Sequence, residues 1–217
     1  MNIAVFGANG RVGSKVVEIA AQRGHTVYPI DVSQNDTHNL DNKEDFDIQK
    51  EGIDVVIDFS TANATDEVCE FCKLHRCALV SGVTGRNEQQ SQQINQLAKE
   101  LPVVTKSNFS VGVETLRRIC EIVSKELEDW DCEIVEIHRK GKIDAPSGTA
   151  KSLAVAVARQ KSFKKVTVHS LRCGSNFGRH DVIFAGNGES LTLTHQAENV
   201  EIFAKGAIIA AEKLVKQ

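Results

Sequence analysis

The densest group of chemically active side chains lies at positions 136–150, which read EIHRKGKIDAPSGTA. His138 titrates near neutrality, and Lys142 carries a full positive charge. Ser147 is a favourable N-cap for the Ala-rich helical run expected over 151–160. Because the first turn of a helix leaves N–H donors unpaired at the positive end of its dipole, this segment predicts a site for an anion such as a carboxylate. The competing interpretation is a capped surface helix beside a solvated basic loop.

A glycine-rich loop, Gly7-Ala-Asn-Gly10-Arg-Val-Gly13, separates a short apolar run from the first helical pattern. Its glycines suit a tight turn, a close approach of backbone to a pyrophosphate, and close helix–sheet packing, so the loop predicts dinucleotide binding rather than a merely structural turn. Asp31 ends the second predicted strand, where a carboxylate binds ribose hydroxyls and repels a 2′-phosphate. No Lys or Arg follows it over 32–34, so we predict that NADH is preferred and that NADPH remains possible.

Strand-like and helical patterns alternate through the first half of the chain, which predicts an α/β fold with a Rossmann-like, doubly wound parallel sheet. The expected strands are 3–6, 26–30, 55–59, 78–80 and 103–105, and the expected helices are 11–23, 62–75 and 87–100. Pro29 is an irregularity, because proline cannot donate to a ladder and fits poorly in a strand near the sheet centre. The polar segment 35–52 is expected to form a loop with at most one weak strand or turn.

The pattern changes after Asn108, which predicts a smaller α+β domain with a mixed or antiparallel sheet. A helix is expected over 113–126, followed by strands at 132–138, 165–173, 180–185 and 190–196. Asn187-Gly188 is a typical hairpin turn between the last two strands. We therefore predict domains at 1–109 and 110–198, with the closing helix, about 199–217, completing the first.

The overall charge and hydropathy exclude several classes of function. The net charge is −3, and no basic stripe with interleaved aromatic residues occurs, which argues against a nucleic-acid partner. No apolar run approaches the roughly 20 residues of a membrane span. The first residues enter a strand pattern without a basic region or an apolar leader segment, so we expect a cytoplasmic protein.

Three of the six cysteines, Cys69, Cys72 and Cys77, cluster around His75. A zinc or redox site is one interpretation, but no second Cys-x-x-Cys motif faces this one. The first two also lie inside a predicted helix rather than at its N-terminus. We therefore predict reduced, mostly buried thiols and no metal.

Three further loops follow predicted strands, at 58–61, 82–85 and 107–112. Ligands of open α/β sheets bind at the carboxyl ends of the strands, so these loops and the glycine-rich loop outline one crevice.

Together with the 136–150 segment, the motifs resemble the dihydrodipicolinate reductase (4-hydroxy-tetrahydrodipicolinate reductase) family over nearly the whole chain. Matching segments are Gly7–Gly13, Asp58–Ser60, Gly82–Gly85, Asn108–Ser110, Lys142–Ala150, His169–Gly174, Gly178–His180, Gly188–Glu189, His195–Ala197 and Phe203–Ala207.

The resemblance implies an NAD(P)H-dependent oxidoreductase of diaminopimelate and lysine biosynthesis. Such an enzyme reduces 4-hydroxy-tetrahydrodipicolinate, a small dicarboxylate, to tetrahydrodipicolinate with loss of water. It further implies a homotetramer whose residues 1–109 bind the dinucleotide and whose residues 110–198 bind substrate and mediate assembly. The alternatives are a non-catalytic dinucleotide sensor, which needs no cationic carboxylate site, and an amino-acid or semialdehyde dehydrogenase, which does not explain the segment 142–149.

Residue roles carry over where the motifs match. The catalytic residues implied are His138 and Lys142, and the substrate-binding residues implied are Arg139, Lys142, Ser147, Gly148 and Thr149. The cofactor-binding residues implied are Gly7, Asn9, Gly10, Arg11, Val12, Gly13, Asp31, Phe59, Ser60, Gly82, Thr84, Ser107, Asn108 and Phe109. Arg139 replaces the second of two adjacent histidines common in the family, and arginine cannot deliver a proton at neutral pH. Gly141 and Val200 also depart from residues that are usual in the family.

Overall fold

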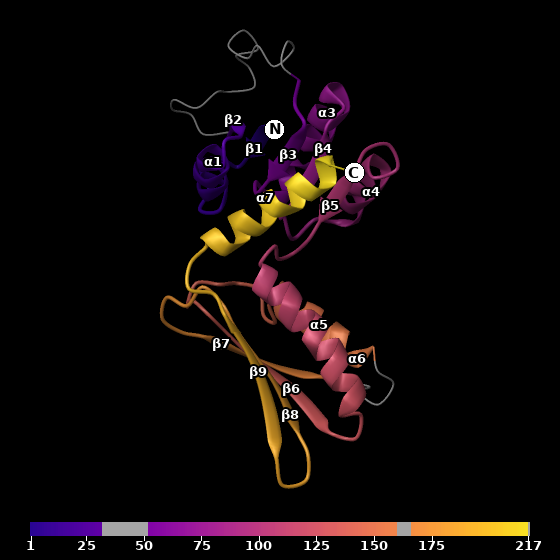
Figure 1. Cartoon of the computed structure of the whole chain (residues 1–217), viewed down its shortest axis with the longest axis vertical. Helices are drawn as coiled ribbons and strands as arrows, with labels where there is room; N and C mark the ends of the chain where they lie inside the picture. Colours follow the sequence, from indigo (N-terminus) through magenta and orange to yellow (C-terminus); the bar gives the residue numbers. More distant parts are fainter. Residues whose placement is uncertain (32–51, 160–165, 217) are drawn as a thin grey trace. The chain divides into compact units, whose positions relative to one another are not determined.

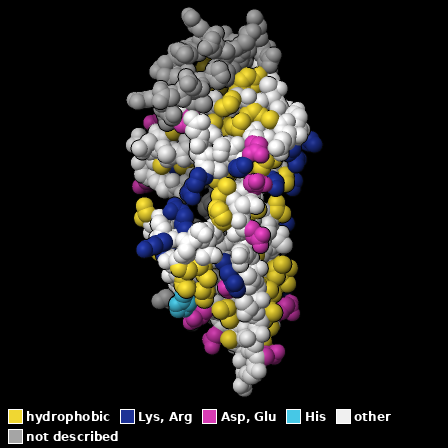
Figure 2. All heavy atoms as spheres, turned by 90° about the vertical axis from the view of Figure 1, so that its left-hand side faces the viewer, with side chains coloured by type: hydrophobic (Ala, Val, Ile, Leu, Met, Phe, Trp, Pro, Cys, Tyr) yellow, Lys and Arg dark blue, Asp and Glu magenta, His cyan; other side chains and the backbone are white. Residues whose placement is uncertain are grey.

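The computed structural model describes residues 1–31, 52–159 and 166–216. The chain forms two compact units, one comprising Met1–Phe109 with Glu201–Gln217 and the other Ser110–Val200 (Figure 1). None of the described helices is both long and apolar enough to span a membrane. On the face drawn in Figure 2, basic side chains occur in several small groups, and acidic and hydrophobic side chains lie among them.

The first unit contains a five-stranded sheet in the order β2-β1-β3-β4-β5, with every pair of neighbours parallel. Its strands are β1 (Asn2–Phe6), β2 (Thr26–Ile30), β3 (Val55–Asp58), β4 (Ala78–Ser81) and β5 (Val103–Thr105). Each lies within a residue of its predicted range. Because parallel strands all end at the same edge, the loops that follow them gather along that edge.

Helices cover both faces of this sheet. On one face, Ile3 and Val5 pack against α1 (Gly13–Gln22) and α7 (Glu201–Val215). On the other face, Ala4 and Phe6 pack against helices that follow β3 and β4. These are the short 3-10 helix η1 (Ala62–Ala64), α3 (Thr65–His75) and α4 (Glu88–Leu97). The predicted doubly wound α/β fold is thus confirmed.

Pro29 requires one correction. Its strand, β2, does not lie near the sheet centre, because β1 is its only partner among the described strands. Proline is tolerated at such an edge, where its missing N–H removes no ladder bond between two central strands. The predicted loop at 35–52 lies, apart from Gly52, outside the described residues.

The second unit contains a four-stranded mixed sheet in the order β7-β6-β8-β9. The strands are β6 (Asp131–His138), β7 (Thr167–Arg172), β8 (Arg179–Ala185) and β9 (Ser190–Gln196). The β6–β7 pair is parallel, and the other two pairs are antiparallel. The last two strands form the predicted hairpin around Asn187-Gly188, where the Gly186 N–H donates to the Glu189 carbonyl at 3.0 Å.

One face of this sheet packs on α5 (Val111–Glu126) and α6 (Gly148–Ala158). Cys132, Ile134, Glu136 and His138 alternate along β6 and are all buried. The first two belong to an ordinary apolar core with the helices. The last two continue the same face, so strand periodicity places a carboxylate and an imidazole next to each other in the interior.

The closing helix α7 belongs to the first unit, where Ala204, Ala207, Ile208 and Ala211 join the core. Gly206 allows the closest approach, since a Cβ atom at this position would lie 1.7 Å from the carbonyl oxygen of Phe109. The absence of a side chain therefore lets the helix lie directly on the end of the segment 1–109.

We predict that Gly206→Ala destabilises the protein even though alanine favours helix by about 1 kcal/mol. Relieving the overlap with backbone should cost about 1–3 kcal/mol or more. Urea unfolding measures the change, with Lys205→Ala, which alters an exposed residue of the same helix, as the control. A Gly206→Ala protein as stable as the control would contradict the packing described.

Candidate functional site

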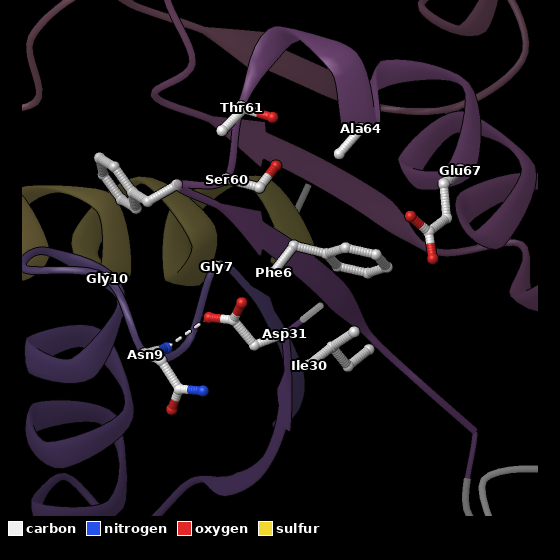
Figure 3. A pocket seen from close by; sticks show the side chains of 11 residues that line it. Phe6, Gly7, Asn9, Gly10, Ile30, Asp31, Ser60, Thr61, Ala64 and Glu67 are labelled. Atoms are coloured by element: carbon white, nitrogen blue, oxygen red, sulfur yellow. Dashed lines mark hydrogen bonds between the residues drawn. The ribbon is translucent and has the colours of Figure 1, made fainter. Parts of the chain in front are cut away.

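A pocket of about 350 Å³ opens at the carboxyl edge of the parallel sheet (Figure 3). Its lining comes from the end of β1 with the glycine-rich loop, the end of β2, the loop after β3, η1 and the start of α3. The lining residues are Phe6, Gly7, Asn9, Gly10, Ile30, Asp31, Phe59, Ser60, Thr61, Ala64 and Glu67. Six of the predicted cofactor-binding residues therefore line one cavity.

The glycine-rich loop has the geometry that dinucleotide binding requires. Gly7 has a φ of 76°, and a Cβ on it would lie 2.6 Å from the carbonyl oxygen of Phe59. A Cβ on Gly13 would lie 2.0 Å from the carbonyl oxygen of Gly7, so the first residue of α1 can pack against this loop only because it has no side chain. Helix α1 also has no side-chain cap at Val12. The start of α1 is the positive end of its dipole, which favours an anion such as the pyrophosphate of a dinucleotide.

Asp31 is fixed beside this loop, because its Oδ2 accepts a hydrogen bond from the Asn9 N–H at 2.7 Å, drawn as a dashed line in Figure 3. Glu67, for which no role was predicted, places a second carboxylate on the same pocket. Two carboxylates therefore line this cavity.

The loops after β3 and β4 are held by a buried ion pair. The Asp58 carboxylate is 1% exposed and accepts hydrogen bonds from the Ser60 N–H at 3.0 Å and the Ser81 hydroxyl at 2.8 Å. Arg86 lies 3.3 Å from the same carboxylate and also donates to the Ser81 and Thr65 hydroxyls at 2.7 and 3.1 Å. This network joins the two loops to α3, and none of its charged members was predicted to have a role.

Aromatic side chains complete this edge of the sheet. The Phe59 ring lies edge-on to Phe109, with centroids 6.1 Å apart. A Cβ on Gly82 would lie 2.3 Å from the Phe59 ring, so only glycine fits below it. The remaining predicted cofactor residues occupy neighbouring loops or, for Gly13, the first position of α1, and they do not line the pocket; these are Arg11, Val12, Gly13, Gly82, Thr84, Ser107, Asn108 and Phe109.

In the second unit, Glu136 is fully buried and accepts four hydrogen bonds. Arg172, at the end of β7, donates from Nη2 to Oε1 at 2.7 Å and from Nη1 to Oε2 at 3.0 Å. The Ser147 N–H donates to Oε1 at 3.2 Å, and His138 Nδ1 is hydrogen-bonded to Oε2. Burial alone raises the pKa of the carboxyl, but the bonds from Arg172 and His138 outweigh it and lower the pKa to about 2.

His138 is mostly buried, and its ring lies edge-on to that of His180, with centroids 5.3 Å apart. Burial lowers the pKa of His138, the Glu136 carboxylate opposes that change, and the positive charges of Lys142 and Arg172 add to it. Burial, followed by the charge of His138, lowers the pKa of His180 to about 4. His180 is therefore neutral at pH 7.

Lys142 and Arg139 lie in the loop after β6. Lys142 Nζ donates to Asp144 Oδ1 at 2.6 Å, a pairing that lowers the pKa of Asp144 despite the opposing effect of burial. An incoming carboxylate therefore has to share or replace Asp144 as the partner of this lysine. Arg139 is exposed, and its Nη1 lies beside Gly141, where a Cβ would come within 2.7 Å.

Ser147 caps α6 as predicted, since its Oγ accepts from the Ala150 N–H at 3.2 Å. The helix begins at Gly148, three residues earlier than expected, and Gln160 lies outside the described residues. The capping bond uses Ala150 rather than Gly148 or Thr149, so the backbone of these two positions stands at the helix N-terminus where an anion is favoured. Ser147 also lies 3.3 Å from His180 Nε2, which joins the helix start to the histidine pair.

One group of side chains in the second unit has the residue types of a metal site. Glu136, His138 and His180 place ligand-type atoms within 4.8 Å of one another. The guanidinium of Arg172 already neutralises the carboxylate of Glu136, so a second cation there is electrostatically disfavoured and the cluster suits a proton better.

Cys69, Cys72 and Cys77 are free, buried thiols in the core of the first unit, in agreement with the prediction. Burial raises the pKa of Cys69, which makes it a poor thiolate.

Glu136, Arg172 and His180 belong to the site but were not predicted from the sequence. Arg172 and His180 stand within matched motifs, but neither had been given a role. Glu136 had one detectable signal: it alternates with His138 on a strand whose other buried positions are apolar. A charged residue in phase with a core is rarely left unpaired.

Comparison with known proteins identifies the family. The family models described as dihydrodipicolinate reductase, N-terminus and C-terminus, match residues 1–109 and 112–217. The 4-hydroxy-tetrahydrodipicolinate reductases of Thermosipho africanus and Staphylococcus haemolyticus are 36% and 34% identical to this chain. Both alignments cover all of this chain, and they cover 93% and 96% of the respective relatives.

A solved structure of dipicolinate-bound dihydrodipicolinate reductase from Paenisporosarcina sp. TG-14 has the same fold, with a TM-score of 0.79 at 21% identity. The superposition covers all of this chain and 95% of that one. The two family models together match the whole chain except residues 110 and 111. This chain belongs to the dihydrodipicolinate reductase family.

Proposed function

We propose that this protein reduces 4-hydroxy-tetrahydrodipicolinate to tetrahydrodipicolinate with loss of water, as a step of diaminopimelate and lysine biosynthesis. The observation that carries the proposal is the site in the second unit, where a carboxylate-held histidine lies beside a capped helix start and a lysine. Names of full-length relatives support it. A dinucleotide sensor would have no use for this second site.

Each part of the chain has a defined task in the proposed reaction. The first unit, with the pocket beside Asp31, binds the nicotinamide dinucleotide, which supplies a hydride when bound. Lys142 and the N-terminus of α6 at Gly148 and Thr149 hold the two carboxylates of the substrate, with Arg139 as an additional cation. His138 donates the proton that leaves with the hydroxyl group as water.

A coupled assay tests the activity directly. Pyruvate and aspartate semialdehyde, with the synthase that condenses them, generate the substrate in the cuvette, and NADH oxidation is followed by absorbance. Oxidation that depends on the synthase supports the proposal. Oxidation of NADH with aspartate semialdehyde alone would instead favour a semialdehyde dehydrogenase.

We predict that Lys142→Ala lowers kcat/KM by about 10²–10⁴-fold, the range expected for a lost proton-handling or charge-binding group. NADH affinity should be unchanged, because the pocket is lined only by residues of the first unit. Titration of fluorescence with NADH measures this affinity. Lys140→Ala, an exposed lysine of the same loop, is the matched control and should retain activity. A large loss of NADH affinity in Lys142→Ala would contradict the assignment.

We predict a preference for NADH over NADPH of at least about tenfold in kcat/KM, or about 1.4 kcal/mol. Asp31→Asn should reduce this ratio, because it removes the charge that repels a 2′-phosphate. Asp66→Asn, which changes an exposed carboxylate outside the pocket, should leave the ratio as it is. A tenfold preference for NADPH would require a cation from elsewhere, and Lys43, which lies outside the described residues, would be the first to test.

We predict a homotetramer that assembles through the mixed sheet of the second unit. Leu193 belongs to the helix-covered core, while Thr192 and Thr194 lie opposite Ile183 and Asp181 on the other face, which no described helix of the unit covers. β-Branched and polar side chains of this kind suit pairing between subunits. Light scattering should give four times the 23.7 kDa of one chain. A mass near 23.7 kDa would refute assembly without touching the site assignments.

A further inference from the structure

His138 has two ring nitrogens in different surroundings. Nδ1 is hydrogen-bonded to the Glu136 carboxylate. Nε2 lies beside Gly178, where a Cβ would come within 2.9 Å of it. A side chain at position 178 would therefore cover Nε2, and glycine leaves it clear. The two contacts fix which nitrogen can exchange a proton with a ligand.

The carboxylate that holds Nδ1 is itself immobilised. Arg172 contacts both of its oxygens from β7, and the Ser147 N–H contacts Oε1 from the start of α6. Arg172 Nη2 also donates to the Asp144 carbonyl at 2.6 Å, which links the arginine to the loop that carries Lys142. The carboxylate therefore cannot rotate away from the imidazole without breaking bonds to two other elements.

We propose that Glu136 is a positioning residue of the reductase reaction, whose Arg172-anchored carboxylate holds Nδ1–H of His138 so that Nε2 faces the substrate as the proton donor. This inference rests on the proposed function. Carboxylate–histidine pairs set the tautomer and orientation of the ring and stabilise its protonated form. A histidine that donates a proton to a substrate gains from all three effects.

The charges around His138 determine how the pH dependence of activity should change when Glu136 is replaced. Glu136 is the negative group in contact with it, Arg172 and Lys142 are positive, and His180 is neutral at pH 7. Without the charge of Glu136, two cations would face the ring unopposed, and the pKa of His138 would fall. Because the protonated ring is the acid, activity should then be lost at a lower pH than in the wild type.

The principal variant is Glu136→Gln, which keeps a carbonyl oxygen as an acceptor and removes the charge. We expect kcat to fall by about 100-fold, as for a misaligned catalytic group. We also expect the alkaline fall in kcat/KM to move to lower pH, with the Kd for NADH unchanged. Glu121→Gln is the matched control, because Glu121, on α5, also accepts two arginine hydrogen bonds, one from Arg117 and one from Arg159. It should leave the profile in place.

NMR titration of His138 separates this inference from the proposed function. In wild-type protein we expect Nδ1 to carry a proton in the neutral ring, and in Glu136→Gln we expect a lower pKa. These measurements hold even if the protein fails to reduce the proposed substrate. A folded Glu136→Gln protein with wild-type kcat, pH profile and His138 pKa would overturn the inference.

If Glu136→Gln does not fold, Glu136→Asp replaces it, because aspartate keeps the buried charge for Arg172 while withdrawing the carboxylate from His138 by one methylene. We then expect kcat to fall while the pH profile stays close to that of the wild type. Wild-type kcat in this variant would show that Glu136 serves the fold alone, and would overturn the inference.

Discussion

The site of the second unit depends on one buried negative charge, the carboxylate of Glu136. A carboxylate removed from water is costly unless it is paired and hydrogen-bonded. Its partners come from three separate places: the end of β7 with Arg172, the start of α6 with Ser147, and His138 two residues farther along β6. Satisfying this single charge therefore fixes a strand pair, a helix start and the orientation of an imidazole together. Lys142 and the Nε2 atom of His138 acquire their places from that arrangement.

Most of the fold could be predicted because its determinants are local in sequence. The apolar run at 3–6 is typical of a parallel strand buried on both faces, and alternation over 190–196 is typical of a strand with two different faces. Strand order is a different matter. Pro29 was expected near the sheet centre, but the crossover from β2 to β3 places β3 on the other side of β1 and leaves β2 with one described neighbour. Periodicity alone carries no information about which side a crossover takes.

The residues of the candidate site also differ in whether their determinants are local in sequence. Ser147 was predictable as a cap and Gly7 as a turn because each acts on backbone a few residues away. Arg172 was not, because it is separated from Glu136 by 36 positions and reaches it only through the parallel register of β6 with β7. Arg86 likewise lies 28 positions from Asp58. Long-range charge pairs of this kind leave no periodic signal, and their only trace is a charged residue at a position where the pattern calls for an apolar one.

Both units use the same device beside a predicted ligand site. Asp58 with Arg86, and Glu136 with Arg172, each tie a buried carboxylate near the end of a strand to an arginine from a later segment. Buried pairs of this type contribute little net stability, because desolvation offsets most of their attraction. These pairs destabilise alternative conformations more than they stabilise the native one, since any loop arrangement that separates the charges leaves a buried charge uncompensated. Loops that must hold cofactor or substrate atoms in place gain a single conformation in this way, which apolar packing at an open sheet edge could not impose.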